Sequence, residues 1–205
     1  MSFFNREEND IDALNNKGFV LLKLGRFEEA IECYEKALAI DGNDSSALGH
    51  KGIELLKLGR YPEAIEYYEK ALAIDGNDSS ALYNKGLALL NLGRYVEALE
   101  CYEKALAIDG NDSIALNNKG LALSALGRYE EAIECYEKAL AIDGNNFAAL
   151  NNKGLALSEL GRYEECIECF EKALAIDGNN IFASNNKGFA LLKAKIGRAS
   201  CRERV

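Results

Sequence analysis

SSALYNKGLALLNLGRYVEALECYEKALAIDGND, which spans Ser79–Asp112, decides the fold, because the rest of the chain repeats this stretch with small changes. Glycines mark the repeat, and three series of them recur at intervals of 34 residues. They are Gly18, Gly52, Gly86, Gly120, Gly154 and Gly188; Gly25, Gly59, Gly93, Gly127 and Gly161; and Gly42, Gly76, Gly110, Gly144 and Gly178. A fixed period of this length predicts a stacked array of repeats in place of a single globular core.

Each repeat is predicted to contain two helices separated by tight turns. In the first copy the apolar residues of Ala13–Leu24 have helical spacing, and Gly25 follows as a residue that can end a helix with positive φ. Phe27–Ile40 carries a second apolar stripe with i, i+3, i+4 and i+7 spacing. The turn after it ends in Asp44 and Ser45, and either side chain can cap the next helix.

This pattern resembles the tetratricopeptide repeat (TPR) family. The matching positions in the third copy are Leu82, Gly86, Leu89, Gly93, Tyr95, Ala98, Tyr102 and Ala105. The resemblance covers Ile11 to Ala194 and implies an all-α fold, a right-handed superhelical solenoid of helix-turn-helix repeats. The chain departs from the family pattern at two positions. Glycine, from Gly42 onward, stands where the family usually has proline near the end of the second helix, and lysine stands where the family favours an apolar residue. These lysines are Lys17, Lys51, Lys85, Lys119, Lys153 and Lys187.

The period divides the chain into three predicted segments. Residues 1–10 are a lead-in, residues 11–194 form the array, and residues 195–205 are a tail outside the repeat pattern. The repeats are 11–44, 45–78, 79–112, 113–146, 147–180 and the partial copy 181–194. The tail, KIGRASCRERV, resembles a translated short-read sequencing adapter, so we predict that Lys195–Val205 is not native and that the natural gene continues past Ala194. A genuine basic tail is the alternative.

The net charge and the first residues of the chain exclude several classes of protein. The net charge is −9, and no basic stripe is visible, which argues against nucleic acid as a direct partner. No apolar run is long enough to span a membrane, and the first residues lack the apolar core of a secretory signal. The sequence therefore predicts a cytoplasmic protein that has no membrane partner.

The cysteines follow the repeat and are predicted to be reduced packing residues. Four of them, Cys33, Cys101, Cys135 and Cys169, share one repeat position, which Tyr67 fills in the second copy. The alternative is a metal or redox site at Cys166 and Cys169, which would need further ligands nearby. The only histidine, His50, is three repeats away, so neither a metal site nor a catalytic constellation is expected. We predict no cofactor and no enzymatic activity.

The resemblance implies that the first helices line a concave groove that binds peptides. The residues at the sixth position of each repeat would face that groove: Asn16, His50, Asn84, Asn118, Asn152 and Asn186. An asparagine amide offers both a donor and an acceptor, so this row can pair with a peptide backbone of any sequence. The alternative is that these asparagines cap or solvate a helix surface. A chaperone-type carboxylate clamp is not evident, because the basic residues it requires are missing.

Two further rows flank these asparagines. Beside them stand Asn15, Tyr83, Asn117 and Asn151, of which Tyr83 is a possible aromatic anchor. The ninth-position residues would supply apolar contact: Phe19, Ile53, Leu87, Leu121 and Leu155. Together these rows favour a protein-interaction scaffold that binds a peptide or a partner helix. Two alternatives stay open: the recognition arm of a larger enzyme or signalling protein, and an array that self-associates through its uncapped C-terminal end.

Overall fold

The computed structural model describes the backbone of residues 10–202 and the side chains of residues 10–196. In this part of the chain it contains eleven α-helices and no strands. The chain divides into two units, Met1–Asp109 and Gly110–Val205, and each is described by itself. The prediction of an all-α array of paired helices is confirmed.

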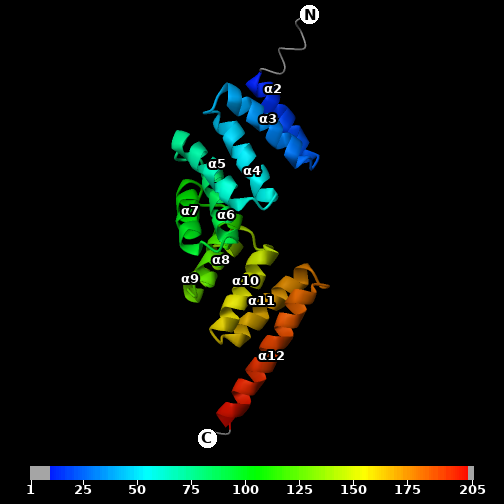
Figure 1. Cartoon of the computed structure of the whole chain (residues 1–205). Helices are drawn as coiled ribbons and strands as arrows, with labels where there is room; N and C mark the ends of the chain where they lie inside the picture. Colours follow the sequence, from blue (N-terminus) through cyan, green and yellow to red (C-terminus); the bar gives the residue numbers. More distant parts are fainter. Residues whose placement is uncertain (1–9, 203–205) are drawn as a thin grey trace, which may run out of the picture. The chain divides into compact units, whose positions relative to one another are not determined.

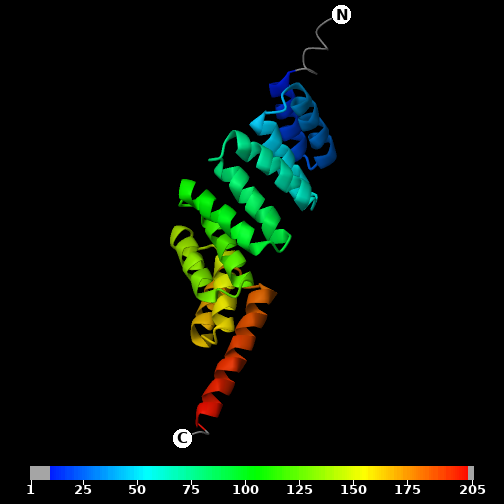
Figure 2. The same ribbon diagram turned by 60° about the vertical axis from the view of Figure 1, so that its left-hand side comes forward.

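The first unit holds three helix pairs, which stack in chain order (Figures 1 and 2). The pairs are α2 (Ile11–Lys23) with α3 (Phe27–Ile40), α4 (Ser45–Lys57) with α5 (Tyr61–Ile74), and α6 (Ser79–Asn91) with α7 (Tyr95–Ile108). The second helix of each pair also packs against the first helix of the next pair. Each predicted repeat in this unit therefore forms one helix pair. Of the predicted lead-in, only Asp10 lies within the described residues, and it caps α2.

The second unit holds two complete pairs and a longer final helix (Figure 1). They are α8 (Ser113–Ala125) with α9 (Tyr129–Ile142), α10 (Phe147–Glu159) with α11 (Tyr163–Ile176), and α12 (Ile181–Arg202). Helix α12 packs against α11 and continues without a break past Ala194. The non-native origin of Lys195–Val205 stays a prediction, and residues 203–205 lie outside the described part.

The helix ends confirm the turn residues predicted from the sequence. The Asp44 side chain accepts a hydrogen bond from the Ala47 N–H at 3.0 Å and so caps α4. Gly25 has φ of 72°, and its counterparts in the next four repeats have nearly the same value. The Arg26 N–H donates to the Leu21 carbonyl at 3.0 Å, which closes α2 in a Schellman motif.

A second glycine series is required by an aromatic ring. A Cβ atom on Gly18 would lie 2.6 Å from the Tyr34 ring, so only glycine lets α3 pack this closely on α2. The same pairing recurs as Gly52–Tyr68, Gly86–Tyr102, Gly120–Tyr136 and Gly154–Phe170. The structure thus identifies the ring that each glycine of this series accommodates.

The lysines that depart from the family pattern form ion pairs between repeats. Lys51 Nζ lies 2.8 Å from Glu35 Oε1, so α4 is tied to the helix that precedes it. Equivalent pairs are Lys85–Glu69, Lys153–Glu137 and Lys187–Glu171. Lys51 also donates to Tyr67 Oη at 2.7 Å. Burial acts to lower the pKa of Lys51, but the hydrogen bonds with Glu35 and Tyr67 outweigh it and leave that pKa raised.

Candidate peptide-binding face

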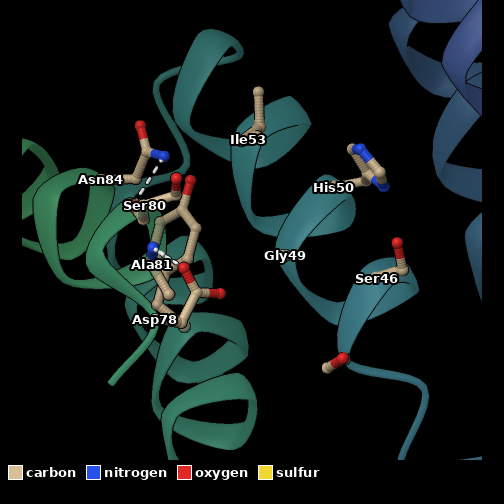
Figure 3. Close-up of a pocket in the computed structure, with 10 residues that line it drawn as sticks. Ser46, Gly49, His50, Ile53, Asp78, Ser80, Ala81 and Asn84 are labelled. Carbon is tan, nitrogen blue, oxygen red and sulfur yellow. Dashed lines mark hydrogen bonds between the residues drawn. The ribbon is translucent and has the colours of Figure 1, made fainter. Parts of the chain in front are cut away.

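In the first unit three of the predicted groove residues line a single pocket. His50 and Ile53 of α4 and Asn84 of α6 border a cavity of about 310 Å³ (Figure 3). The full lining is Ser45, Ser46, Gly49, His50, Ile53, Tyr68, Asp78, Ser80, Ala81 and Asn84. The Asn84 amide donates to the Ser80 carbonyl at 2.9 Å, and its oxygen is turned away from Ser80 (Figure 3).

Among the predicted residues of the first repeat, Phe19 lies beside His50. Phe19 is 42% exposed, and its ring centroid is 5.9 Å from that of His50. Asn16 is exposed. The Asn15 amide donates to Asp44 Oδ2 at 2.7 Å, so it holds the residue that caps the following helix. Phe19 is therefore the member of this group that offers exposed apolar surface.

In the third repeat the flanking candidates Tyr83 and Leu87 do not line the pocket, whereas Asn84 does. Tyr83 is half-buried, and its ring centroid is 6.0 Å from that of Tyr102. Leu87 is also half-buried. Tyr83 thus packs partly on its own repeat and does not line the pocket.

In the second unit the predicted asparagines bond to one another or to their own helix. The Asn152 amide donates to Asn117 Oδ1 at 3.0 Å, and the Asn117 amide is 3.3 Å from Asn118 Oδ1. Asn151 is 5% exposed and donates to the Phe147 carbonyl at 3.0 Å. The amides of this unit therefore form a chain within the protein.

The remaining candidates of the second unit vary in exposure. The Asn186 amide nitrogen is buried and has no hydrogen-bond partner. Leu121 is half-buried and Leu155 is 38% exposed. This unit therefore offers less free amide surface than the asparagine row suggests, and its apolar contribution is uneven.

The structure adds a buried carboxyl group that the site prediction missed. Glu54 is fully buried, and neither of its carboxyl oxygens has a hydrogen-bond partner. Burial raises the pKa of Glu54, and Lys57 partly opposes that shift. The equivalent residues in the other repeats are Val20, Ala88, Ala122, Ala156 and Ala190. Comparing the copies position by position would have singled out this residue.

Two tyrosines lie near this carboxyl group, and the histidine stacks on one of them. Burial raises the pKa of Tyr34 and of Tyr68, and the nearby Glu54 raises both further. Neither phenol oxygen has a hydrogen-bond partner. The His50 ring stacks on Tyr34 with centroids 5.4 Å apart, and its Nδ1 is also buried without a partner. The second repeat therefore concentrates polar groups that lack partners next to the pocket.

The cysteines occupy packing positions, as the sequence predicted. Cys33, Cys101, Cys135, Cys166 and Cys169 are free and buried. Burial raises the pKa of Cys166 to about 11, so its thiol stays protonated near neutral pH. Over the described residues no cluster of His, Cys, Asp and Glu could hold a metal ion. In the same part of the chain, no helix has both the length and the apolar character needed to cross a membrane.

Comparison with solved structures finds TPR proteins. The YrrB structure, described as a TPR protein with an unusual peptide-binding site, is 25% identical with a TM-score of 0.76, over 88% of this chain and 93% of that chain. A MamA structure is 27% identical with a TM-score of 0.75, over 82% and 92% of the two chains. MamA from Desulfovibrio magneticus RS-1 is 26% identical with a TM-score of 0.78, over 83% and 97%.

Comparison with family models gives the same result. Tetratricopeptide repeat models match residues 10–77, 78–145 and 147–180, which is most of the chain. Comparison with curated protein sequences gives no match. The structural likenesses support a general role in binding other proteins. The chain belongs to the tetratricopeptide repeat family.

Proposed function

We propose that the chain is a protein-interaction scaffold that binds an extended peptide across the face carrying the asparagine row. The observation that carries this proposal is the pocket in the first unit, because it gathers His50, Ile53 and Asn84 around one cavity. The YrrB structure, described as having a peptide-binding site, is consistent with this use of the fold.

The chemistry of this face suits a peptide backbone. The Asn84 amide nitrogen is held by Ser80, so its oxygen is left to accept a hydrogen bond from a peptide N–H. Ile53 is half-buried and Phe19 is exposed, so both can contact apolar peptide side chains. In the second unit the bonded amides of Asn117 and Asn152 would present a more rigid polar row.

The experiment is selection of peptides from a random-sequence library on the immobilised protein, followed by measurement of Kd by fluorescence anisotropy. We expect the double variant His50→Ala with Asn84→Ala to weaken the selected peptides about tenfold, through loss of two polar contacts. The control is Glu66→Ala, which removes an exposed carboxylate from α5 outside the pocket lining.

Two results would count against this proposal. Selection of no peptide beyond those that an unrelated protein retains is one of them. Equal affinity of the parent and the double variant, with unchanged helicity, is the other. Selection of peptides that become helical on binding would favour the partner-helix form of the proposal over the extended peptide.

Self-association is a second candidate function, and α12 favours it. Phe189 is 52% exposed and Leu192 is 55% exposed on this helix. A Cβ on Gly188 would meet nothing within 4 Å, whereas the equivalent Gly154 is covered by the Phe170 ring. We expect light scattering to show dimers that Phe189→Glu with Leu192→Glu abolishes. A parent that stays monomeric at high concentration would remove this candidate.

A further inference from the structure

The pocket of the second repeat is lined by a glycine at a position where other repeats carry a larger side chain. Gly49 stands where the other complete repeats have Asn15, Tyr83, Asn117 and Asn151. A Cβ built on Gly49 would meet nothing within 4 Å, so packing does not require a glycine there. The cavity of about 310 Å³ has room for one long side chain, since a water molecule takes up about 30 Å³ in the liquid.

Gly49 also cannot make the hydrogen bond to a capping carboxylate that Asn15 makes at the same position of the first repeat. In the first repeat the Asn15 amide donates to Asp44 Oδ2 at 2.7 Å, while Asp44 Oδ1 caps α4. In the second repeat Asp78 Oδ1 accepts from the Ala81 N–H at 3.0 Å and caps α6 in the same way. Gly49 has no amide to offer Asp78 Oδ2. A donor in the pocket would therefore occupy the place of the missing asparagine nitrogen.

The rest of the lining presents acceptors and no permanent positive charge. It contains no lysine or arginine, and Asp78 is its one carboxylate. Ser46, Ser80 and Asn84 add polar side chains to the same lining (Figure 3). A ligand that donates several hydrogen bonds and carries a positive charge fits this set best.

Two buried groups of the same repeat lack hydrogen-bond partners. Tyr68 lines the cavity, is 1% exposed, and has no hydrogen-bond partner for its phenol oxygen. Glu54 is fully buried outside the pocket lining, and both of its carboxyl oxygens lack partners. Alanine at the equivalent positions shows that the repeat does not need a carboxyl group there.

We propose that the pocket between α4 and α6 takes the ammonium group of a lysine side chain from a bound peptide, with Asp78 as its ion-pair partner. This inference rests on the proposed function, because the bound peptide supplies the lysine. It makes the second repeat the position at which the array selects its partner by sequence.

The test is a titration of the full chain followed by the backbone amide NMR signals of Gly49, Ser80 and Ala81. The probes are Nα-acetyl-lysine amide, Nα-acetyl-norleucine amide and alanine amide. We expect saturable shifts with the lysine probe and binding weaker by about tenfold with norleucine, which has no ammonium group. Equal binding of norleucine would overturn the proposal, and binding of alanine amide alone would overturn the choice of lysine over a peptide amino terminus.

Two variants sharpen the titration. Gly49→Asn fills the pocket with the side chain that other repeats carry, and we expect it to abolish the lysine shifts. Asp78→Asn keeps a capping side chain but removes the charge, and we expect binding to fall about tenfold. Glu66→Ala, outside the pocket lining, should leave the lysine probe unaffected. Unchanged binding in Gly49→Asn and Asp78→Asn would show that the pocket is not the site.

The peptides selected in the test of the proposed function distinguish extended-peptide binding by the scaffold from lysine binding in the pocket. If those peptides bind the parent and Gly49→Asn equally well and show no preference for lysine, the scaffold stands and the lysine pocket is wrong. If no peptide is selected but the lysine probe still binds the pocket, the site stands and extended peptide binding is wrong.

Discussion

The second and fourth repeats share a backbone plan but treat their buried polar groups differently. In the fourth repeat Ser124 Oγ lies 3.1 Å from Tyr136 Oη, so the buried phenol has a partner. In the second repeat Leu56 replaces that serine, and the Tyr68 phenol has none. The second repeat also buries Glu54, where the fourth has Ala122.

This difference separates the features that recur in both repeats from the features that differ between them. Both repeats keep the glycine that accommodates the ring and the glycine that ends the first helix. The polar differences cost stability, because a buried group without a partner loses its hydrogen bonds to water. They lie beside a pocket that is lined by three of the predicted groove residues, which is where a functional cost is expected.

The largest effect is expected from giving the fourth repeat a buried carboxyl group. Ala122→Glu would place a carboxyl group at a fully buried position, and we expect the free energy of unfolding to fall by roughly 3 kcal/mol or more. Urea unfolding followed by circular dichroism measures the loss. The control is Ala125→Glu, which adds the same charge at an exposed position of α8. Equal losses in both variants would remove burial as the cause.

Removing the buried carboxyl group from the second repeat is expected to change the free energy of unfolding by a smaller amount and to stabilise the protein. Glu54→Ala restores the residue found in the third to sixth repeats, and we expect a gain of about 1–3 kcal/mol near neutral pH. Hydrogen exchange should place the added protection in α3, α4 and α5. Glu54→Gln keeps the size and polarity and should give much less of the gain. A destabilised alanine variant would mean that Glu54 has a partner that offsets its burial.

The pH dependence of the stability difference between the parent and Glu54→Gln isolates the effect of the Glu54 charge. Because burial raises the pKa of Glu54 above its usual 4.5, its contribution to stability is most favourable below that value and is lost as pH rises through the folded pKa. Lys57 is the charged group that opposes this shift. The stability advantage of Glu54→Gln over the parent should therefore grow between about pH 4 and pH 8. A constant difference over that range would show that Glu54 does not change its ionisation on folding.

The fold was predictable because its determinants are local. The turn at Gly25 and the cap at Asp44 depend on neighbours in the sequence, and the structure confirms both. The Glu35 partner of Lys51 comes from the preceding helix pair, so the lysine could be seen only as a departure from the family. For that reason the period predicted the helices without showing which contacts join the repeats.

The pocket was less predictable because it depends on what is missing. Gly49 was visible in the sequence, but the space it leaves follows from the placement of Asp78 and Asn84 around it. Glu54 was visible as the odd residue of its series, yet its burial requires knowledge of the face that packs on the preceding repeat. The row of asparagines predicted a uniform face, whereas in the second unit Asn117 and Asn152 bond to each other.

The smallest change in stability is expected from removing the hydrogen-bond partner of the buried Tyr136 hydroxyl in the fourth repeat. Burial raises the pKa of Tyr136 to about 12, and the hydrogen bond with Ser124 opposes that rise. Ser124→Ala removes the partner and should lower the free energy of unfolding by about 1 kcal/mol. In a Tyr136→Phe background the same substitution should cost almost nothing, because Phe170 shows that this position accepts a ring without a hydroxyl. If Ser124→Ala costs as much with phenylalanine as with tyrosine, the loss comes from packing, and the two repeats do not differ in the way their hydrogen bonds suggest.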